Sequence, residues 1–441
     1  MIYKDESILC NGFRDIMKDA AKKFKDPSLC AEQGCYISYP TTFLPLDYMN
    51  GLRIPITTMD EDVQFVYDSL GIAEGSINMV VGPTSTAKTT LAVQIACRIA
   101  QRFQASCVIH EDAEGATNKS RIQNITGWNS KMIRNKYIIR DVGITTDSFF
   151  QRTVAHCKQK MLLANQYPDT LYYNTGIIDE DKKMVRKLVP TVIIMDSLPM
   201  LMPVKMAEDE GFGSNMNAAH VAKANTIMFK KLIPLIKEAN VIIFLINHLQ
   251  DNINTNAFIP QAAQINYLKQ SEKIPGGNAV LYLVNNIFRM SKVSNLVDTK
   301  DFGINGWIAR STIIKSRSNR AGQDVPLVYN QEYGFDSILS SYMLLKSNDR
   351  IKSNGAWFYF DGLETSKFQQ KYLTQKMQED PKLRLFFKES IKEFGSDCLS
   401  GSKAFIQKEA RSSADEDTIG AAYKDQILSS LMDDADFSIG I

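Results

Sequence analysis

The chain has 441 residues, of which 44% are hydrophobic and 23% are charged, a composition typical of a globular protein with about two or three domains. Its net charge of +2 excludes a strong overall attraction to nucleic acid, so any DNA-binding function requires local surfaces. No run reaches the ~18 apolar residues of a membrane span, and the seven scattered cysteines lack the spacing of metal ligands. We therefore expect a soluble cytoplasmic protein with reduced thiols and no membrane partner.

The first part of the chain, residues 1–60, is predicted to be an N-terminal oligomerisation segment that leads into the core. It contains a candidate amphipathic helix over residues 13–24, followed by a stretch in which proline and glycine mark turns. A short helix is expected over residues 60–70. The main domain is assigned to residues 61–347.

A phosphate-binding loop is predicted within residues 77–90, INMVVGPTSTAKTT. An apolar, β-branched run is followed by a tight loop and then by a helix-period segment over residues 89–103. Lys88 provides a cation for phosphates and Thr89 a hydroxyl for Mg²⁺, and the helix N-terminus presents backbone N–H groups. Ala87 stands where the strict motif has glycine, so a purely structural turn is the alternative. The residues expected around the nucleotide are Gly82, Pro83, Thr84, Ser85, Thr86, Ala87, Lys88, Thr89 and Thr90.

Strands and helices alternate after this loop. Strand-like apolar runs lie at residues 106–110, 137–140, 191–195 and 241–246, and helical stretches lie at residues 148–163 and 218–238. Because each strand is a continuous apolar run, the pattern predicts an α/β protein with a mostly parallel sheet covered on both faces. Between residues 165 and 190, the turn Asn174-Thr175-Gly176 predicts a surface hairpin.

The sequence changes character after residue 283. The runs LVNNIFRMSKV, GWIARSTIIKSRS and VPLVYN predict antiparallel strands that extend the sheet, and residues 336–346 predict a closing helix. Residues 348–411, with helix-period runs over 367–377 and 381–394, are assigned to a small C-terminal α/β domain. Residues 412–441 form an acidic tail.

Carboxylates follow two of the predicted strands. Asp196 ends an apolar strand where a parallel sheet presents its ligands, which suits a direct or water-mediated contact to Mg²⁺. Glu114 follows the neighbouring strand and is the candidate to polarise a water that attacks the γ-phosphate. Glu111 is the rival candidate for this role. A structural strand end and a solvated acidic loop are the alternative interpretations.

A polar pair, Asn247-His248, ends a third strand, where it can sense a γ-phosphate or simply be a satisfied polar pair. The long Asn/Gln-rich segment 250–275 follows and ends in Gly276-Gly277-Asn278, whose backbone can approach a phosphodiester closely. A second glycine-containing loop, residues 203–217, leaves the Asp196 strand and is expected nearby.

Six motifs in this order, GPTSTAKTT, DAEG, IIMDSLPML, INHL, GGNAV and IIKSRS, resemble the RecA-type homologous-recombination ATPases, over about residues 36–340. Within that family the chain is most similar to the bacteriophage UvsX branch, which implies a location in the host-cell cytoplasm. The resemblance implies a RecA-like P-loop ATPase core that binds ATP and Mg²⁺ between the protomers of a helical filament. It also implies single- and double-stranded DNA, and single-strand-binding and mediator proteins, as partners.

The resemblance further implies a role for individual residues. Lys88 and Thr89 would hold phosphate and metal, and Glu114 would be the catalytic carboxylate. The nucleotide sensor would be Asn247-His248, and Lys315 and Arg317 would reach the γ-phosphate bound by the neighbouring protomer. The residues that would contact DNA, on or beside the two loops, are Lys205, Lys223, Lys269, Lys273, Gly276, Gly277 and Asn278.

One departure from the family concerns the base of the nucleotide. Arg121 occupies the position where the family has a tyrosine that stacks on adenine, and a guanidinium plane can stack on a base as well. Two other functions remain open. A hexameric replicative helicase of the DnaB type shares the Lys-x-Arg pair, and a non-catalytic nucleotide-switch scaffold would require that Glu114 be inert.

Overall fold

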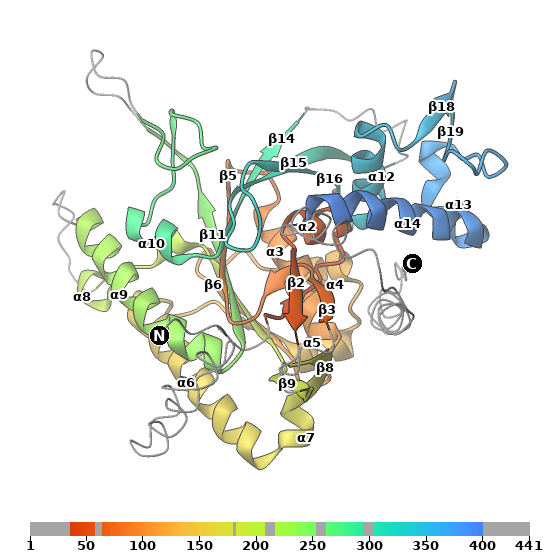
Figure 1. Cartoon of the computed structure of the whole chain (residues 1–441). Coiled ribbons are helices and arrows are strands. Elements are labelled where there is room, and N and C mark those ends of the chain that lie inside the picture. Colours follow the sequence, from red (N-terminus) through yellow and green to blue (C-terminus); the bar gives the residue numbers. More distant parts are fainter. Residues whose placement is uncertain are drawn as a thin grey trace, which may run out of the picture.

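The computed structural model describes residues 36–57, 64–179, 182–207, 217–252, 262–293 and 304–399. A nine-stranded sheet in the order β17-β16-β15-β14-β5-β11-β10-β6-β7 forms its centre (Figure 1). The predicted N-terminal helix and the acidic tail lie outside the described residues, as do parts of both candidate DNA-binding loops. In the described part of the chain, no helix combines the length and the apolar character that crossing a membrane requires.

Six neighbouring strands of the sheet run parallel to one another. Most of their interior residues are apolar and buried, as expected for strands covered on both faces. The predicted mostly parallel α/β sheet is therefore confirmed. The six strands are β5 (Ile77–Gly82), β6 (Val108–Asp112), β7 (Tyr137–Arg140), β10 (Thr191–Asp196), β11 (Val241–His248) and β14 (Asn286–Lys292).

Three antiparallel strands extend the sheet beyond β14. They are β15 (Gly306–Lys315), β16 (Gln323–Asn330) and β17 (Gly334–Asp336), and each pairs antiparallel with the strand before it. The prediction is wrong for β14, which pairs parallel with β5 on one side and antiparallel only with β15 on the other. The direction of a strand depends on the path of the preceding connection, which local sequence does not encode.

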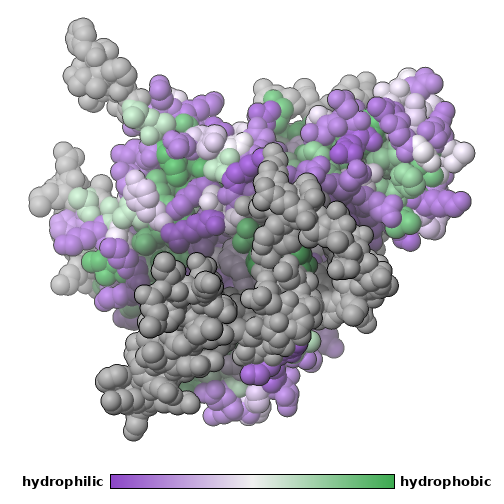
Figure 2. Space-filling model, in the orientation of Figure 1, coloured by the Kyte–Doolittle hydropathy of each residue, from purple (hydrophilic) through white to green (hydrophobic). Residues whose placement is uncertain are grey.

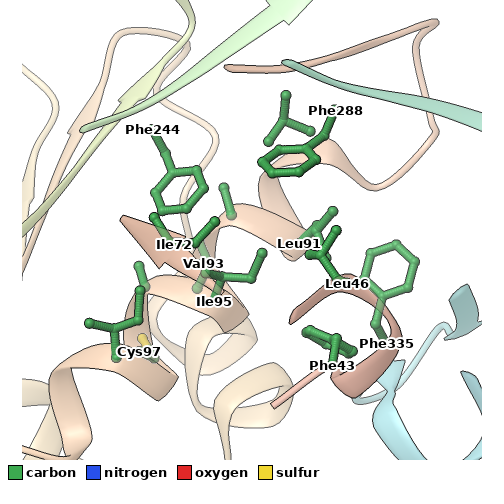
Figure 3. Close-up of a cluster of buried hydrophobic side chains, with 14 of the residues drawn as sticks. Phe43, Leu46, Ile72, Leu91, Val93, Ile95, Cys97, Phe244, Phe288 and Phe335 are labelled. Carbon is green, nitrogen blue, oxygen red and sulfur yellow. The ribbon is translucent and has the colours of Figure 1, made fainter. Parts of the chain in front are cut away.

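Helices cover both faces of the sheet. On one face lie α3 (Lys88–Gln101), α4 (Lys119–Thr126) and α5 (Ser130–Lys136), and on the other lie α6 (Thr146–Gln166) and α9 (Asn217–Glu238). Figure 3 shows Leu91, Val93 and Ile95 of α3 close to Phe244 and Phe288 of the sheet. In the same cluster, α2 (Leu44–Met49) contributes Leu46, so the region just ahead of the phosphate loop belongs to the main core.

The helix predicted over residues 60–70 is wrong where the structure describes it, because β3 (Gln64–Ser69) is a strand. It pairs antiparallel with β2 (Leu52–Thr57), and an ion pair of 2.7 Å between Arg53 and Asp68 joins the two strands. Aromatic and β-branched residues in the run QFVYDS favour an extended backbone, and the partner strand completes its hydrogen bonds.

The excursion before β10 is a hairpin, as predicted, but its turn is elsewhere. Strands β8 (Tyr172–Ile178) and β9 (Met184–Leu188) pair antiparallel. The predicted turn Asn174-Thr175-Gly176 lies inside β8, where the register shifts and Gly176 has a φ of 78°. Gly176 therefore marks an irregularity within the strand, and the chain reverses between Ile178 and Met184.

The C-terminal elements pack against α2 and α12 (Ser337–Ser347), the predicted closing helix. They are β18 (Lys352–Asn354), β19 (Trp357–Tyr359), α13 (Leu373–Glu379) and α14 (Pro381–Cys398). α13 begins later than predicted, because Phe368 pairs with Phe358 in an isolated bridge. On the face in Figure 2, hydrophilic residues dominate the described surface and hydrophobic residues form small patches between them.

Candidate functional site

Four parallel strands bring their polar ends to one edge of the sheet. His248 of β11 is paired with Gly82 of β5, and Asp196 of β10 is paired with Asp112 of β6. Strands β6, β10 and β11 extend beyond their apolar runs into polar residues, and β5 ends in Gly82 at the start of the loop. The phosphate loop and the predicted carboxylates are therefore neighbours, as is usual at the carboxyl end of a parallel sheet.

The loop between β5 and α3 is shaped for close contact with a ligand. Its tip, residues 83–85, is exposed, and Ala87 adopts the left-handed conformation with a φ of 60°. The glycine-like backbone of a phosphate loop is thus retained despite the Cβ of Ala87. The ammonium of Lys88 donates a hydrogen bond of 2.8 Å to the carbonyl of Pro83. Burial lowers the pKa of Lys88, and the negative charges of Asp196 and Glu114 oppose that shift.

A hydroxyl and a carboxylate meet at the start of α3. Thr89 Oγ1 donates a hydrogen bond of 2.7 Å to Asp196 Oδ2. In the described part of the chain, no cluster of three or more His, Cys, Asp or Glu side chains forms a self-contained metal site. A hydroxyl with one carboxylate suits Mg²⁺ bound to a nucleotide, because phosphate oxygens and water complete its octahedral coordination. The residues present therefore fit Mg²⁺ together with a triphosphate.

Glu114 is in contact with the histidine of the predicted sensor pair. Its Oε1 lies 3.2 Å from Nε2 of His248, and each of the two side chains is 35% exposed. Glu114 lies just beyond β6 and His248 ends β11, so the contact spans the end of β10 between them. A carboxylate with this exposure is accessible to a ligand or a water.

The rival carboxylate, Glu111, has a different environment. Its side chain is 2% exposed and forms ion pairs of 2.7 Å with both Arg140 and Arg152. Arg152 belongs to α6, so Glu111 points toward the α6 face of the sheet, whereas α3 and the phosphate loop are on the other face. Both oxygens of Glu111 are engaged in these ion pairs.

The sensor pair also contacts the glycine motif. The amide of Asn247 donates a hydrogen bond of 2.9 Å to the carbonyl of Pro275, immediately before Gly276. Gly276 and Gly277 have φ values of 102° and 95°, and a Cβ on Gly277 would lie 2.8 Å from Cβ of Ala222. The backbone conformation therefore favours glycine at both positions, and packing against α9 requires it at Gly277.

The ends of the candidate loop 250–275 are joined by a short hairpin. Strands β12 (Gln250–Asp251) and β13 (Glu272–Lys273) pair antiparallel, and Arg289 of β14 forms a bidentate ion pair with Glu272. Among the predicted DNA-contacting residues, four have side chains that are exposed in the structure: Lys223, Lys269, Lys273 and Asn278. Gly276 and Gly277 are half-buried. Residues 208–216 and 253–261 lie outside the described residues, and Lys205 is described only as part of α8 (Val204–Ala207).

Lys315 and Arg317 converge on one acceptor, although Arg317 lies beyond the end of β15. Both donate to the carbonyl of Tyr282, at 2.9 and 2.6 Å, and Lys315 also donates to the carbonyl of Leu281. These carbonyls lie at the C-terminal end of α10 (Asn278–Leu283), the helix that begins at the glycine motif. Burial, and then the charge of Arg317, lower the pKa of Lys315 to about 8.

Arg121 contacts the connection between β16 and β17. Its guanidinium donates to the carbonyls of Gln331 and Glu332, at 2.6 and 2.8 Å, and to the hydroxyl of Tyr329. The same connection packs on α3, because a Cβ on Gly334 would lie 2.9 Å from Thr90 Cγ2. Three N–H groups of the Arg121 guanidinium that a base or ribose could use are thus hydrogen-bonded within the chain.

The sequence interpretation missed two buried residues beside Asp196. His110 of β6 has its Nε2 3.8 Å from Asp196 Oδ2, and its Nδ1 lies 2.8 Å from the hydroxyl of Tyr137 on β7. The available signal was a histidine inside the apolar run CVIHED. A polar residue in the middle of a buried strand requires a partner.

No family model matches the chain. Among curated proteins, a mitochondrial DNA repair protein recA homolog of Dictyostelium discoideum is 22% identical over 369 residues, which cover 82% of this chain and 69% of the relative. Protein RecA of Pseudomonas putida is 23% identical over 353 residues, covering 79% of this chain and 84% of the relative. Protein RecA of Nitratidesulfovibrio vulgaris is 22% identical over 317 residues, covering 71% and 74%. Together with the mostly parallel sheet and its phosphate loop, these similarities support a RecA-like fold and the RecA-type recombinase family for this chain.

Proposed function

We propose that this protein is an ATP-dependent DNA recombinase that forms helical filaments on single-stranded DNA and promotes homologous pairing and strand exchange. One observation carries the proposal. The phosphate loop, Glu114 and the Asn247-His248 pair form one continuous set of contacts that ends at the glycine motif beside the candidate DNA loop. The similarity to RecA proteins, one of them named for DNA repair, favours recombination as the process.

The residues of the loop would bind the nucleotide through charge and backbone geometry. Lys88 would exchange the carbonyl of Pro83 for phosphate oxygens, and the first N–H groups of α3 would face the same oxygens. Thr89 and Asp196 would orient the metal and its water ligands. Bound Mg²⁺–ATP supplies a γ-phosphate that accepts an attacking water and a metal that neutralises the developing charge. Glu114 would orient and deprotonate that water.

The contact between Glu114 and His248 would couple the nucleotide to DNA. A change in the position of Glu114 or His248 alters the neighbouring Asn247, which holds the carbonyl before Gly276. The glycine motif and the exposed lysines would then bind the DNA backbone in one nucleotide state and release it in the other. Binding would depend strongly on salt, because it would rest on phosphate contacts.

Two finer proposals concern the branch of the family that the chain resembles and the residues that reach the neighbouring protomer. The non-glycine residue at 87 and the motif Lys315-Ser316-Arg317 support the bacteriophage UvsX branch. In the filament, Lys315 and Arg317 would exchange the carbonyls of α10 for the γ-phosphate of the adjacent protomer. Single-strand-binding and mediator proteins would be further partners.

Electron microscopy of the protein with single-stranded DNA and a non-hydrolysable ATP analogue tests the assembly. Extended helical filaments are expected, and the Lys88→Ala variant should form none under the same conditions. Closed rings would instead indicate a hexameric helicase, the second function that a Lys-x-Arg pair supports.

Strand exchange between circular single-stranded DNA and a homologous linear duplex tests the activity itself. Joint molecules should form with the homologous duplex and not with a heterologous duplex of equal length. Filaments that form without joint molecules or ATP hydrolysis would indicate a nucleotide-switch scaffold.

A further inference from the structure

A buried polar chain lies beneath the proposed nucleotide site, on the α3 face of the sheet. The hydroxyl of Tyr137 lies 2.8 Å from His110 Nδ1, and His110 Nε2 lies 3.8 Å from Asp196 Oδ2. The same Asp196 oxygen accepts the hydrogen bond from Thr89. His110 is 0% exposed and Tyr137 is 5% exposed. The chain therefore joins the edge strand β7 to the first turn of α3 through one carboxylate.

Three buried polar atoms without hydrogen-bond partners among the described residues belong to Asp196's neighbours in the chain or on the adjacent strand. They are His110 Nε2, Asp112 Oδ1 and Ser197 Oγ. Asp112 is the register partner of Asp196 on the neighbouring strand, and Ser197 follows Asp196 directly. An unsatisfied buried polar atom costs about 1–3 kcal/mol, so a structural role alone gives His110 no advantage over an apolar residue here.

The contacts of His110 favour one of its two neutral tautomers. If Nδ1 were the donor in a neutral ring, the lone pair of Nε2 would face the carboxylates of Asp196 and Asp112. In the other tautomer, the hydroxyl of Tyr137 donates to Nδ1, and Nε2–H faces Asp196 Oδ2. Only this second arrangement places a positive edge toward the two carboxylates. The carboxylates thus favour the tautomer in which His110 is a donor toward Asp196, and the hydroxyl of Tyr137 satisfies Nδ1 in that tautomer.

We propose that His110, whose ring is anchored by its hydrogen bond to Tyr137, is a positioning residue that orients the Asp196 carboxylate for the metal side of the nucleotide site. The proposal rests on the proposed ATP- and Mg²⁺-binding function. Among the residues that the structure describes, the Asp196 carboxylate would otherwise be restrained by its hydrogen bond from Thr89, whose hydroxyl must also face the metal. Groups that hold a metal-binding carboxylate from behind commonly change metal affinity by about 10–100-fold when they are removed.

Two conservative variants separate positioning from structural support. His110→Phe keeps a planar ring and removes both nitrogens, and Tyr137→Phe removes only the hydroxyl. His110→Phe removes Nε2, which lacks a hydrogen-bond partner, but it also leaves the buried hydroxyl of Tyr137 without its partner, so the melting temperature of this variant should fall modestly. The double variant His110→Phe/Tyr137→Phe removes both polar groups and should regain that melting temperature. Tyr342→Phe is the matched control, since it removes another buried tyrosine hydroxyl, which bonds Gln370 far from this site.

Binding of a fluorescent ATP analogue to the full-length protein, titrated with Mg²⁺, measures the effect without turnover. For both variants we expect the Mg²⁺ concentration at half-saturation to rise about tenfold, while nucleotide affinity without metal stays the same. His110→Gln, which restores a donor at a similar reach, should recover part of the loss. The double variant should be no worse than His110→Phe alone, because Tyr137 acts through His110.

Three outcomes would overturn the proposal, and they differ from one another. An unchanged Mg²⁺ midpoint in both variants, with normal Mg²⁺-dependent binding by the wild type, would remove the role of His110 and leave the nucleotide site intact. If a variant loses nucleotide affinity in the absence of metal together with melting temperature, His110 would be a structural residue. Absence of Mg²⁺-dependent nucleotide binding in the wild type would remove the proposed function and this inference with it.

Discussion

Glu111 and Glu114 are three residues apart, yet their surroundings differ. Glu111 is buried between two arginines, whereas Glu114 is one-third exposed beside His248. Glu114→Gln should slow ATP hydrolysis by about 10²-fold or more, because the amide keeps the shape and loses the base. It should leave the free energy of unfolding nearly unchanged. Steady-state hydrolysis and urea denaturation measure the two quantities.

Glu111→Gln is the matched variant and should behave in the opposite way. Removing its charge leaves Arg140 and Arg152 without their shared partner and should lower the free energy of unfolding by about 1–3 kcal/mol. Hydrolysis per folded molecule should be retained. A stable Glu111→Gln variant with strongly reduced hydrolysis would make Glu111 the catalytic acid.

Lys160 should make the free energy of unfolding depend on pH. The Lys160 ammonium on α6 is 6% exposed and donates to Val189, Thr191 and Asn240 at the opposite end of the sheet. Burial lowers its pKa from 10.5 to about 7. Between these two values the unfolded chain binds more protons than the folded chain, so the free energy of unfolding rises with pH, by up to about 1.4 kcal/mol per pH unit.

Lys160→Met isolates this contribution. Subtracting the free energies of unfolding of the variant from those of the wild type should give a difference that rises with pH above about 7. Urea denaturation at a series of pH values provides the comparison. A difference that stays flat over this range would show that Lys160 remains charged in the folded protein with an ordinary pKa.

At the scale of elements, the hairpin β12–β13 connects the strands beside the phosphate loop to the candidate DNA loop. Arg289 of β14 is paired in register with Val81 of β5, and it clamps Glu272 at the base of the loop with one bond of 2.9 Å. The two side chains are 10% and 16% exposed. The clamp thus fixes the return of the loop to the strand beside the phosphate loop.

Charge reversal tests this clamp. Arg289→Glu or Glu272→Arg alone should cost about 3 kcal/mol in the free energy of unfolding, because each leaves like charges facing each other in a mostly buried site. The double reversal should recover part of the loss in stability and of DNA-stimulated hydrolysis. If the double variant is no better than the singles, the pair does not hold the loop.

For the whole molecule, Lys315 and Arg317 decide whether the proposed site is completed by a neighbour. Both now bond carbonyls of their own α10, where cations are favoured at a helix C-terminus. Under the filament proposal, a Lys88→Ala variant lacks a functional phosphate loop. A Lys315→Ala/Arg317→Ala variant lacks the two cations, called the fingers below, that would reach the γ-phosphate of the neighbouring protomer. Each alone should be inactive in DNA-dependent hydrolysis.

Mixing the two variants equally should restore part of this hydrolysis, because about a quarter of random interfaces would pair an intact loop with intact fingers. Co-assembly is confirmed separately, by labelling the two variants and measuring energy transfer between them. Co-assembled variants that remain inactive would place the fingers outside the neighbouring site and count against the filament.

The sequence by itself determined the features that depend on local chemistry. Continuous apolar runs specified the buried parallel strands, and the sequence around Lys88-Thr89 specified the strand, tight loop and helix of the candidate phosphate loop, even with Ala87 in the glycine position. Asp196 and His248 were located correctly at strand ends, since a strand exposes its polar groups where it leaves the core. These signals lie within a few residues of one another along the chain.

Only the tertiary structure decided which groups meet. It engaged Glu111 with arginines from another strand and a helix, turned β14 parallel to β5, and paired β3 with β2 instead of forming a helix. It likewise joined His110 to Tyr137 and Asp196, from three different strands. Most of these partners are tens or hundreds of residues apart in sequence. The direction of a side chain across a sheet follows from pairing register, which is a property of the assembled fold.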